Sequence, residues 1–580
     1  MLYLALSYLL ISLICLLTGI VLYEALHFRK TSSAPPDGKP LVVYMITGLI
    51  VLTGIGQWVV LVLPLSIFVP VVLLLIIMIA ALFLRKRVVN RFGFLWNEFK
   101  NQPAVCLVGL ALVSSMILVL NAGPAIMDDT DSYHVQMIKW VQEYGTVPGL
   151  ANLHGRFGFN SSWFIAIGML SPKMGSINHY LVLNGVVSFW LCQYLFEKMS
   201  AALTDPAAAY SGNKITGIMV LLLLAVITWP MLRGNATSAN YDFITCCCIL
   251  VLFMETCFSK NANLLPEWVI WPCFLFTIRM INYPLLLLVV IALWQVYRKR
   301  HFRQLGWYMI AGILLMAPFI ARNILLSGYP FFPVYGIDPF GVDWKADKTV
   351  IANMVEFIQY YNRVNTGIQS IEETRQLAFP QWIPQWFHYL FRYDKPVVVL
   401  GLLSVAFCLL QWNRIRKRFT IHAQLFTGVI LLQLLSWFFL SPDPRFAYGP
   451  FLCCIFMVSM LFRNLSLAIQ IKRILTATII LIFSGCFIYT VRKSVMEPHY
   501  RHWCVPRKLP VPPVHTILVD GITVSIPGKI GPNWNARCYG TPLPCLYFAD
   551  PRLRARGKTV AEGFYIDNTI VVSFEKGFWY

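Results

Sequence analysis

Charged residues are scarce in this sequence, and their scarcity excludes an ordinary soluble protein. Only 13% of the 580 residues are Asp, Glu, Lys or Arg, whereas 58% are hydrophobic. About 20 consecutive apolar residues suffice to cross a bilayer as a helix, and runs of that kind recur from one end of the chain to the other. The runs are continuous rather than alternating, which favours helices over barrel strands. We therefore expect an integral membrane protein.

The sequence also lacks the motifs of nucleotide-dependent proteins. It has no Gly-x-x-x-x-Gly-Lys-[Ser/Thr] phosphate loop and no Gly-x-Gly-x-x-Gly string placed after a strand. ATP-driven transport and direct use of nucleotide sugars are therefore disfavoured. The net charge of +21 comes from short basic clusters between apolar runs, so we expect no nucleic-acid partner. No small-residue cleavage site follows the first apolar run, and we expect no signal peptide.

The apolar runs predict the fold class. We expect an all-α polytopic membrane protein with about 14 transmembrane helices (roughly 12 to 14) and a small β-containing extracytoplasmic tail. Pro272, Arg279 and Pro284 interrupt the runs at 266–280 and 283–297, so one of that pair is a candidate re-entrant segment. The expected spans are 2–23, 41–62, 66–84, 103–120, 179–196, 214–231, 241–258, 266–280, 283–297, 306–324, 394–411, 420–440, 446–462 and 474–490.

Basic residues cluster after odd-numbered spans, and such clusters mark the cytoplasmic side. The clusters are Arg29 and Lys30; Arg85, Lys86, Arg87 and Arg91; Arg298, Lys299, Arg300 and Arg303; Arg414, Arg416, Lys417 and Arg418; and Arg463, Lys472 and Arg473. We divide the chain into N-terminal helices with their cytoplasmic connection (1–102), a transmembrane core (103–490) and an extracytoplasmic tail (491–580). Loops 121–178 and 325–393 of the core then face outside.

The first external loop holds three carboxylates within four residues: Asp128, Asp129 and Asp131. A helix with an apolar face follows them. Crowding raises the pKa of one carboxylate and leaves another ionised. An ionised acid there can act as general base on an incoming hydroxyl, and the cluster could bind a divalent cation. The alternative is that Asp129 or Asp131 caps the helix, although a cap needs only one acid.

This arrangement resembles the GT-C glycosyltransferases, which include protein O-mannosyltransferases, oligosaccharyltransferases and aminoarabinose–lipid A transferases. The shared features are an acidic pair outside an early span, a tyrosine, and an amphipathic helix that lies along the membrane in the family. The chain departs from the family by three extra spans and by Asp-Asp-Thr-Asp in place of Asp-Glu. Similarity to a poorly characterised bacterial branch rests on Asp128, Tyr133-His134, Trp140, Gly149, Asn152-Leu153-His154 and Arg156.

The resemblance implies an inverting glycosyltransferase that takes a sugar from a polyprenyl phosphate. The acceptor would be a glycan, lipid or protein at the cell envelope, as in polysaccharide biosynthesis. The site would face the periplasm or exterior of a bacterial cytoplasmic (inner) membrane. The superfamily's spacing from its key Asp to an aromatic residue fits Asp129 and Tyr133 best. Asp129 is therefore the first candidate for the catalytic base, ahead of Asp128 and Asp131.

Three arginines are candidates for the donor phosphate. Arg445 lies in a short external turn, Arg322 ends a span, and Arg279 interrupts one. A guanidinium offers a planar fork to phosphate oxygens, but each arginine could instead reach the headgroups or satisfy backbone carbonyls. The other residues expected to bind substrate are Tyr133, His134 and Arg156.

A divalent metal ion is a candidate cofactor, with Asp128, Asp131 and His134 as its ligands. Metal dependence occurs in some members of the superfamily and is absent in others. His134 and His154 lack the usual ligand spacing of one metal-binding helix, so structural hydrogen bonding is the alternative for both.

Loop 325–393 and the tail carry further signals. The loop is rich in aromatic residues that suit an interfacial belt or a platform for sugar rings, and 348–362 predicts a helix. In the tail, Asp520-Gly521 lies between two β-prone runs and predicts a hairpin. Cys538 and Cys545 predict a small disulfide loop outside the membrane.

Two alternatives to the transferase stay open. A polysaccharide polymerase of the O-antigen or capsule type shares the many-span plan and would depend on arginine more than on aspartate. A transporter or flippase of lipid-linked glycans should carry ionisable residues at mid-membrane depth, where Arg279 is one of few.

Overall fold

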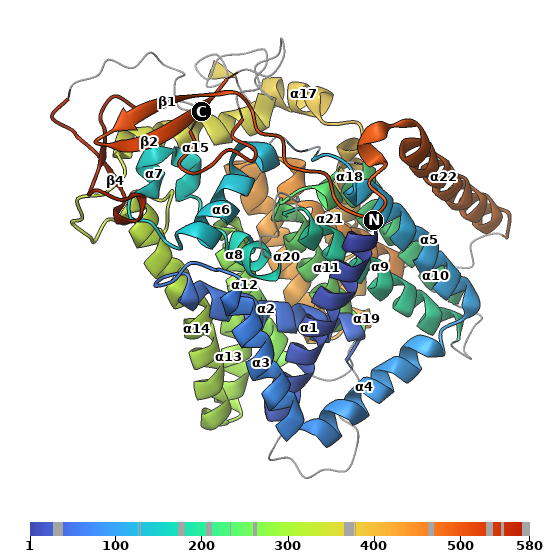
Figure 1. Cartoon of the computed structure of the whole chain (residues 1–580). Coiled ribbons are helices and arrows are strands. Elements are labelled where there is room, and N and C mark those ends of the chain that lie inside the picture. The colour runs from blue at the N-terminus through green and yellow to red at the C-terminus, as the bar shows by residue number, and fades with distance from the viewer. Residues whose placement is uncertain are drawn as a thin grey trace.

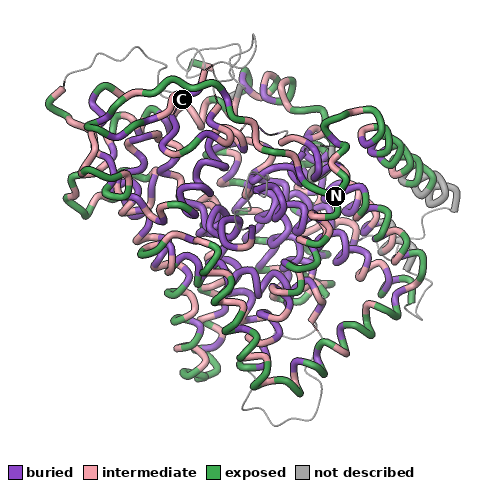
Figure 2. Tube along the Cα trace, viewed as in Figure 1, coloured by how far each residue is buried: buried purple, intermediate pink, exposed green. Residues whose placement is uncertain are grey.

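The structure is a computed structural model, and its chain is mostly helical (Figure 1). It describes residues 1–26, 39–125, 127, 129–171, 180–204, 211–232, 234–258, 264–364, 376–377, 379–461, 469–528, 537–546 and 550–570. Figure 2 shows that the interior of the helical body is buried throughout, while the outer helices expose much of their surface.

Apolar helices build the body. They are α1 (Leu2–Leu26), α2 (Leu41–Val59), α3 (Phe68–Phe83), α5 (Ala104–Asn121), α8 (Ser162–Leu170), α9 (Val182–Leu203), α10 (Ser211–Leu222), α11 (Asp242–Phe258), α12 (Leu265–Ile278), α13 (Leu286–Arg298), α14 (Phe302–Ser327), α18 (Asp394–Leu410), α20 (Ile421–Leu440), α21 (Tyr448–Leu461) and α22 (Ile469–Met496). The shorter or more polar helices are α4 (Arg85–Lys100), α6 (Val135–Glu143), α7 (Leu150–Leu153), α15 (Lys348–Val364), α17 (Phe379–Tyr389) and α19 (Trp412–Arg418).

The expectation of 14 spans is not supported. By length and composition, six helices among the described residues could cross a membrane, or up to eight if each of two bent pairs is one span. The bent pairs are α3 with α4, at 97°, and α18 with α19, at 75°. The six are α1, α2, α5, Met280–Arg298, α14 and α20.

Short, protein-buried helices account for much of the difference. α12 and α21 have 14 residues each, so each rises only about 21 Å, less than a hydrocarbon core of about 30 Å. The expected span 214–231 changes from α10 to a π-helical stretch at Leu223–Leu232. α11 is buried along nearly its whole length. A hydrophobic helix inside a protein core reads in the sequence like one that faces lipid.

The chain breaks where Arg279 interrupts the apolar runs. α12 ends at Ile278, Arg279 is extended, and a 3₁₀ turn at Met280–Leu285 begins the next apolar segment. That turn and α13 together form one candidate span, Met280–Arg298, whereas α12 is too short to be one. The interruption that the sequence predicts therefore places Arg279 at a helix end.

The N-terminus and the tail lie on the same side of the molecule. The Met1 ammonium donates to the His502 carbonyl at 2.5 Å, and Leu2 N–H donates to the Trp503 carbonyl at 2.9 Å. The basic helix α4 lies at the opposite end from Met1 in Figure 1. Of the other basic clusters, Arg29, Lys30 and Arg463 lie outside the described residues, as do the side chains of Lys472 and Arg473.

The tail forms the expected hairpin. β1 (Val514–Val519) pairs antiparallel with β2 (Ile522–Pro527), and Val519 lies opposite Ile522. Asp520 and Gly521 have φ of 48° and 90°, as a two-residue type I′ turn requires. Cys538 and Cys545 form a disulfide with Cα atoms 6.0 Å apart. A second small sheet pairs β3 (Leu553–Ala555) with β4 (Phe564–Ile566).

The described part of loop 325–393 forms two helices above the body (Figure 1). α15 covers the helix predicted at 348–362. In α17, Trp382 and Trp386 are buried, and the Trp386 indole donates to the Pro442 carbonyl at 2.7 Å. These two aromatic side chains therefore pack inside the protein rather than forming an open surface.

Candidate functional site

The acidic stretch begins a helix, as its sequence predicts. A π-helix, Thr130–His134, continues directly into α6. Gly145, with φ of 78°, follows the helix end. Every residue from 135 to 142 is buried, including Gln136 and Lys139. The structure therefore differs from the surface-lying helix that the resemblance implies, because the tail covers the polar face of α6. We call residues 129–134 the acidic segment.

Arg445 lies in a tight turn between α20 and α21, which we call the arginine turn (residues 441–446). Its 3₁₀ core is Pro444–Phe446, and the Asp443 carboxylate accepts the Arg445 N–H at 3.1 Å. The Trp437 indole donates to the Asp443 carbonyl at 2.7 Å. Together with the Trp386 contact to Pro442, these bonds hold the turn from two sides.

The arginine turn meets the acidic segment, although the two lie 316 residues apart in sequence. Arg445 Nη1 donates to Asp129 Oδ2 at 2.9 Å. Arg445 Nε lies 2.8 Å from Asp443 Oδ2 and 3.7 Å from Asp242 Oδ2. Asp242 in turn accepts a hydrogen bond from Arg279 Nη1. One guanidinium is thus shared by three carboxylates, and a second holds the most buried of them.

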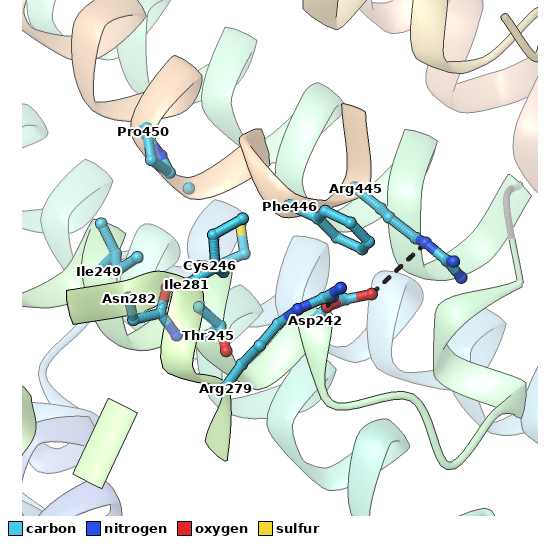
Figure 3. A pocket seen from close by; sticks show the side chains of 11 residues that line it. Asp242, Thr245, Cys246, Ile249, Arg279, Ile281, Asn282, Arg445, Phe446 and Pro450 are labelled. Atoms are coloured by element: carbon cyan, nitrogen blue, oxygen red, sulfur yellow. Dashed lines mark hydrogen bonds and ion pairs between the residues drawn. The ribbon is translucent and has the colours of Figure 1, made fainter. Parts of the chain in front are cut away.

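Asp242, Arg279 and Arg445 border a small pocket, shown in Figure 3, whereas Asp129 and Asp443 are not part of its lining. Arg279 and Arg445 approach Asp242 from two different elements, and the Phe446 ring lies 3.3 Å from the Arg279 guanidinium carbon. The pocket is small, with a cavity volume of about 10 Å³, which is room for about one water molecule. Its remaining lining comes mainly from α11 and α21: Thr245, Cys246, Ile249, Gly449 and Pro450. It combines two cations with an apolar wall.

Aromatic rings and a third arginine surround the acidic segment. The Arg156 guanidinium carbon lies 5.8 Å from the Tyr133 ring centre. The His134 ring lies 4.4 Å from Tyr133, 5.3 Å from Phe164 and 5.5 Å from Tyr241. The structure therefore brings Asp129, Tyr133, His134, Arg156, Arg279 and Arg445 into one region.

Neighbouring charges fix the protonation of the Asp129–Arg445 pair. Burial works to raise the pKa of Asp129, but Arg445 and Arg156 outweigh it and hold that pKa well below its usual range. Burial works to lower the pKa of Arg445, but the carboxylates of Asp443, Asp129 and Asp242 raise it well above its usual range. Asp129 is therefore ionised and Arg445 charged at neutral pH.

His134 has the opposite character. Burial lowers the pKa of His134 to about 3, because Asp129 only partly offsets the cost of desolvating a charged ring. The ring is therefore neutral at pH 7. Its Nδ1 is buried and has no hydrogen-bond partner among the described residues. His154 also has its pKa lowered to about 3 by burial, and its Nδ1 accepts the Arg156 N–H at 3.0 Å.

Three expected site residues lie elsewhere or cannot be placed. Asp128 lies outside the described residues. The Asp131 carbonyl accepts the Tyr539 N–H at 3.3 Å, so its backbone faces the tail. Arg322 is buried and donates to Asn160 Oδ1 and, at 3.2 Å, to Thr146 Oγ1. Arg322 therefore serves a different polar cluster from Arg445.

The expected metal site is only partly visible. Within the described part of the chain, no three His, Cys, Asp or Glu side chains gather as a metal ion would need. Of the expected ligands, His134 lies among aromatic rings, and Asp128 is not described. Because one of the three expected ligands is not described, the metal site stays a prediction.

Sequence reasoning missed Asp242 and Asp443. Asp242 follows the polar stretch at 234–241 and begins α11, and its side chain is only 4% exposed. A carboxylate at the start of an apolar run is costly unless it has a use, and this cost is the signal that could have found Asp242. Asp443 lies two residues before Arg445, in the turn from which the sequence analysis selected only the arginine.

Comparison with known proteins gives a family without an assigned activity. A family model described as "Domain of unknown function (DUF8201)" matches residues 1–452. The match includes the acidic segment, Asp242, Arg279 and Arg445. No curated protein and no solved structure matches the chain significantly.

Proposed function

We propose that this chain, which belongs to the family of domains of unknown function DUF8201, is a GT-C-like membrane glycosyltransferase. It moves a sugar from a polyprenyl-phosphate donor to a glycan, lipid or protein acceptor. The observation that carries this proposal is the 2.9 Å contact between Asp129 and Arg445 beside a cationic pocket. A candidate base and a candidate phosphate ligand, predicted separately from two loops, lie together.

The proposed reaction is an inverting displacement. The oxygen of the acceptor hydroxyl bonds to the anomeric carbon, and the bond from that carbon to the phosphate oxygen breaks. The electron pair of that bond leaves on the lipid phosphate, and the hydroxyl proton passes to the Asp129 carboxylate. Arg445 and Arg279 stabilise the charge that develops on the leaving phosphate, because both guanidinium groups border the pocket.

Donor binding switches Asp129 into a stronger base. While Arg445 pairs with Asp129, the carboxylate has a pKa far below neutrality and takes up a proton poorly. A phosphate that binds Arg445 competes with Asp129 for the same guanidinium. The pKa of Asp129 then rises toward the value that a general base needs, because the cation that lowers it most is engaged by the phosphate. The base becomes effective only when a donor is in place, which limits wasteful hydrolysis.

Asp242 has a supporting role in this scheme. It accepts a hydrogen bond from Arg279 and lies 3.7 Å from Arg445. Two arginines near a single pocket repel each other, and a carboxylate between them offsets that repulsion. Asp242 therefore offsets the repulsion between the two guanidinium groups that border the pocket.

We place the site on the extracytoplasmic side of a bacterial cytoplasmic membrane. Two observations support that side. The Cys538–Cys545 disulfide belongs to an oxidising compartment, and residues of the same loop contact Asp131 and Gln136. Met1 also contacts the tail, which places the N-terminus on the side of the disulfide.

Mass analysis of cell-surface glycans tests the proposal. Cells that lack the gene are complemented with the wild type or with Asp129→Asn. Loss of a general base costs about 10² to 10⁴ in rate, so the variant should make almost no product. Asp343→Asn is the matched control, because Asp343 is an exposed external acid paired with Arg556. The proposed mechanism is wrong if Asp128→Asn, Asp129→Asn and Asp131→Asn all keep full product.

Two other results would favour the alternatives. Loss of product in Arg445→Gln, with full product in all three aspartate variants, would indicate a polymerase that relies on arginine. Accumulation of an unused lipid-linked glycan on the cytoplasmic leaflet would indicate a transporter or flippase. The donor class is then identified by adding purified chain in nanodiscs to polyprenyl-phosphate sugars and measuring the free polyprenyl phosphate released.

A further inference from the structure

A loop of the tail lies directly on the helix that begins at Asp129. The loop and the helix are more than 400 residues apart in sequence. We propose that this disulfide-closed loop (residues 538–545, the tail loop) is a positioning element that fixes the acidic segment opposite Arg445. The inference deepens the proposed function and rests on it, since the acidic segment matters for transfer only if Asp129 is the base. The tail loop also lies beyond the residues that the family model matches.

Hydrogen bonds join the two segments at several points. Tyr539 donates its N–H to the Asp131 carbonyl at 3.3 Å, and its own carbonyl accepts from Gln136 Nε2 at 3.0 Å. Lys139 Nζ donates to the carbonyls of Gly540, at 3.4 Å, and Thr541. The bonds begin within the acidic segment and continue along one face of α6. They engage backbone carbonyls of the tail loop, so their geometry depends on how that loop is folded.

The contact between the tail loop and α6 is buried. Gln136 and Thr541 are fully buried, and Lys139 is 5% exposed. A buried ammonium is costly unless oxygen atoms replace its water, and the tail loop provides those oxygens. Cys538 and Cys545 are themselves buried at the same place. Without a folded tail loop, the side chains of Gln136 and Lys139 would either face solvent or stay buried with unsatisfied hydrogen-bond donors.

The disulfide maintains a backbone shape that the chain would otherwise avoid. Tyr539 has φ of 42°, in the left-handed region that residues with a Cβ rarely adopt. Its N–H and its carbonyl are the groups that meet the acidic segment and α6. Within the loop, Thr541 N–H donates to the Cys538 carbonyl at 2.8 Å. Closing the loop through Cys538 and Cys545 restricts the alternatives that would release Tyr539.

The tail loop is in turn fixed to the rest of the tail. Ser525 N–H, on β2, donates to the Pro544 carbonyl at 2.9 Å, and Leu546 N–H donates to the Ser525 carbonyl at 3.1 Å. Gly540 N–H donates to the Pro510 carbonyl at 3.0 Å. The hairpin therefore anchors the tail loop, and the tail loop in turn contacts the acidic segment. Displacement of that segment by about 1 Å is enough to disturb an aligned base.

Hydrogen exchange on the full chain in lipid nanodiscs tests the inference without any substrate. The double variant Cys538→Ser/Cys545→Ser should speed amide exchange in residues 129–143 by about tenfold or more, because local opening becomes easier. Brief reduction of the folded wild type should do the same. Cys504→Ser is the matched control: it changes an exposed free cysteine of the same tail and should leave that exchange unchanged. Exchange in α13 reports whether the fold is intact.

A second pair of variants leaves the disulfide in place. Lys139→Gln removes the charge that binds the tail loop and should speed exchange in residues 129–143, whereas Lys139→Arg should restore protection. Unchanged exchange in that stretch after loss of the disulfide would overturn the inference. The rate of polyprenyl phosphate release in nanodiscs then separates the two proposals. Faster exchange with a lower kcat and unchanged donor KM supports both, whereas faster exchange with full activity keeps the positioning contact and rejects Asp129 as the base.

Discussion

Two buried clusters of charge lie in different parts of this protein, and they are built differently. The inner cluster consists of Tyr23, Glu24, Lys39, Arg91 and Glu267. There, Glu267 accepts from Tyr23 and from Lys39 at 2.5 Å, and Arg91 Nε lies 3.2 Å from Glu24. The outer cluster consists of Asp129, Asp242, Arg279, Asp443 and Arg445. There, one arginine is shared by three carboxylates beside a pocket.

The difference shows how to distinguish ion pairs that join helices from a cluster that can bind a ligand. In the inner cluster each carboxylate has its own cation, and the pairs join helices far apart in sequence, such as α1 with α4 and α12. Such pairs specify how helices pack, without any need for a ligand. In the outer cluster, Asp129, Asp443 and Asp242 share Arg445, and the contact to Asp242, at 3.7 Å, is longer than a hydrogen bond. An incoming anion could take over one of its contacts, which is what a binding site requires.

Arg445→Gln should give the largest effect and breaks the outer cluster. Asp242, Asp129 and Asp443 would lose their shared cation, and leaving a buried charge without its partner costs about 3–5 kcal/mol. We expect loss of glycan product together with a marked fall in the thermal midpoint in detergent. Arg445→Lys keeps the charge but not the planar fork, so it should recover stability more than activity. Equal recovery of both would argue against a phosphate-binding role.

Glu267→Gln should break the inner cluster with a somewhat smaller effect. The amide keeps a hydrogen-bond acceptor for Tyr23 and Lys39 but loses the charge, which we expect to cost about 2–3 kcal/mol. Activity per folded molecule should stay near the wild-type value, because this cluster only fastens helices. Thermal unfolding and a product assay on the same preparation measure both quantities. A loss of activity at unchanged stability would contradict the view that the inner cluster only joins helices.

The pH dependence of stability should sharpen the comparison, because His134 belongs to the acidic segment and His154 contacts Arg156, whereas the inner cluster contains no histidine. Burial lowers the pKa of His154 to about 3. Below a pH of about 6.5 the unfolded chain takes up a proton that the folded protein refuses, so stability is full above that pH and declines as the pH falls. The loss between pH 7 and 5 should be about 2 kcal/mol for each such histidine.

His154→Gln removes one of these two contributions. The free energy of unfolding of the variant should therefore change less between pH 7 and 5 than that of the wild type, by about 2 kcal/mol. Denaturant unfolding in detergent at several pH values measures it. Identical pH profiles for the two proteins would mean that the ring of His154 is protonated in the folded state.

Asp343→Asn should give the smallest effect and serves as a reference for both clusters. Its ion pair with Arg556 Nε, at 2.7 Å, is exposed on the outer face. Exposed pairs contribute about 0.2–1 kcal/mol, so the thermal midpoint should hardly move and raised salt should mimic the variant. A loss as large as that of Glu267→Gln would show that burial is not what separates these pairs.

Local sequence patterns predicted local structure well. The helix after the acidic stretch, the Asp520-Gly521 hairpin and the helix at 348–362 all depend on neighbouring residues, and the structure contains each. The number of spans could not be predicted in this way. An apolar helix such as α11 has the same composition whether lipid or protein surrounds it.

The candidate site was predictable only in part. Asp129 and Arg445 stand out because charges are rare in this chain and both lie at span ends. Nothing in one sequence says that Asp242 comes between Arg279 and Arg445, since those three positions are brought together only by packing of α11, α12 and α21. Arg322 looked equivalent to Arg445 by the same local criteria, yet Thr146 and Asn160 occupy its guanidinium.

The Asp129–Arg445 contact also sets the order in which this protein can mature. Its two halves are separated by 316 residues, and the tail loop that lies on the first half is made almost 100 residues after the second. During synthesis Asp129 is therefore made long before its partner exists. Until residue 445 has been added, the chain holds a carboxylate without its arginine, and the contact with the tail loop forms later still.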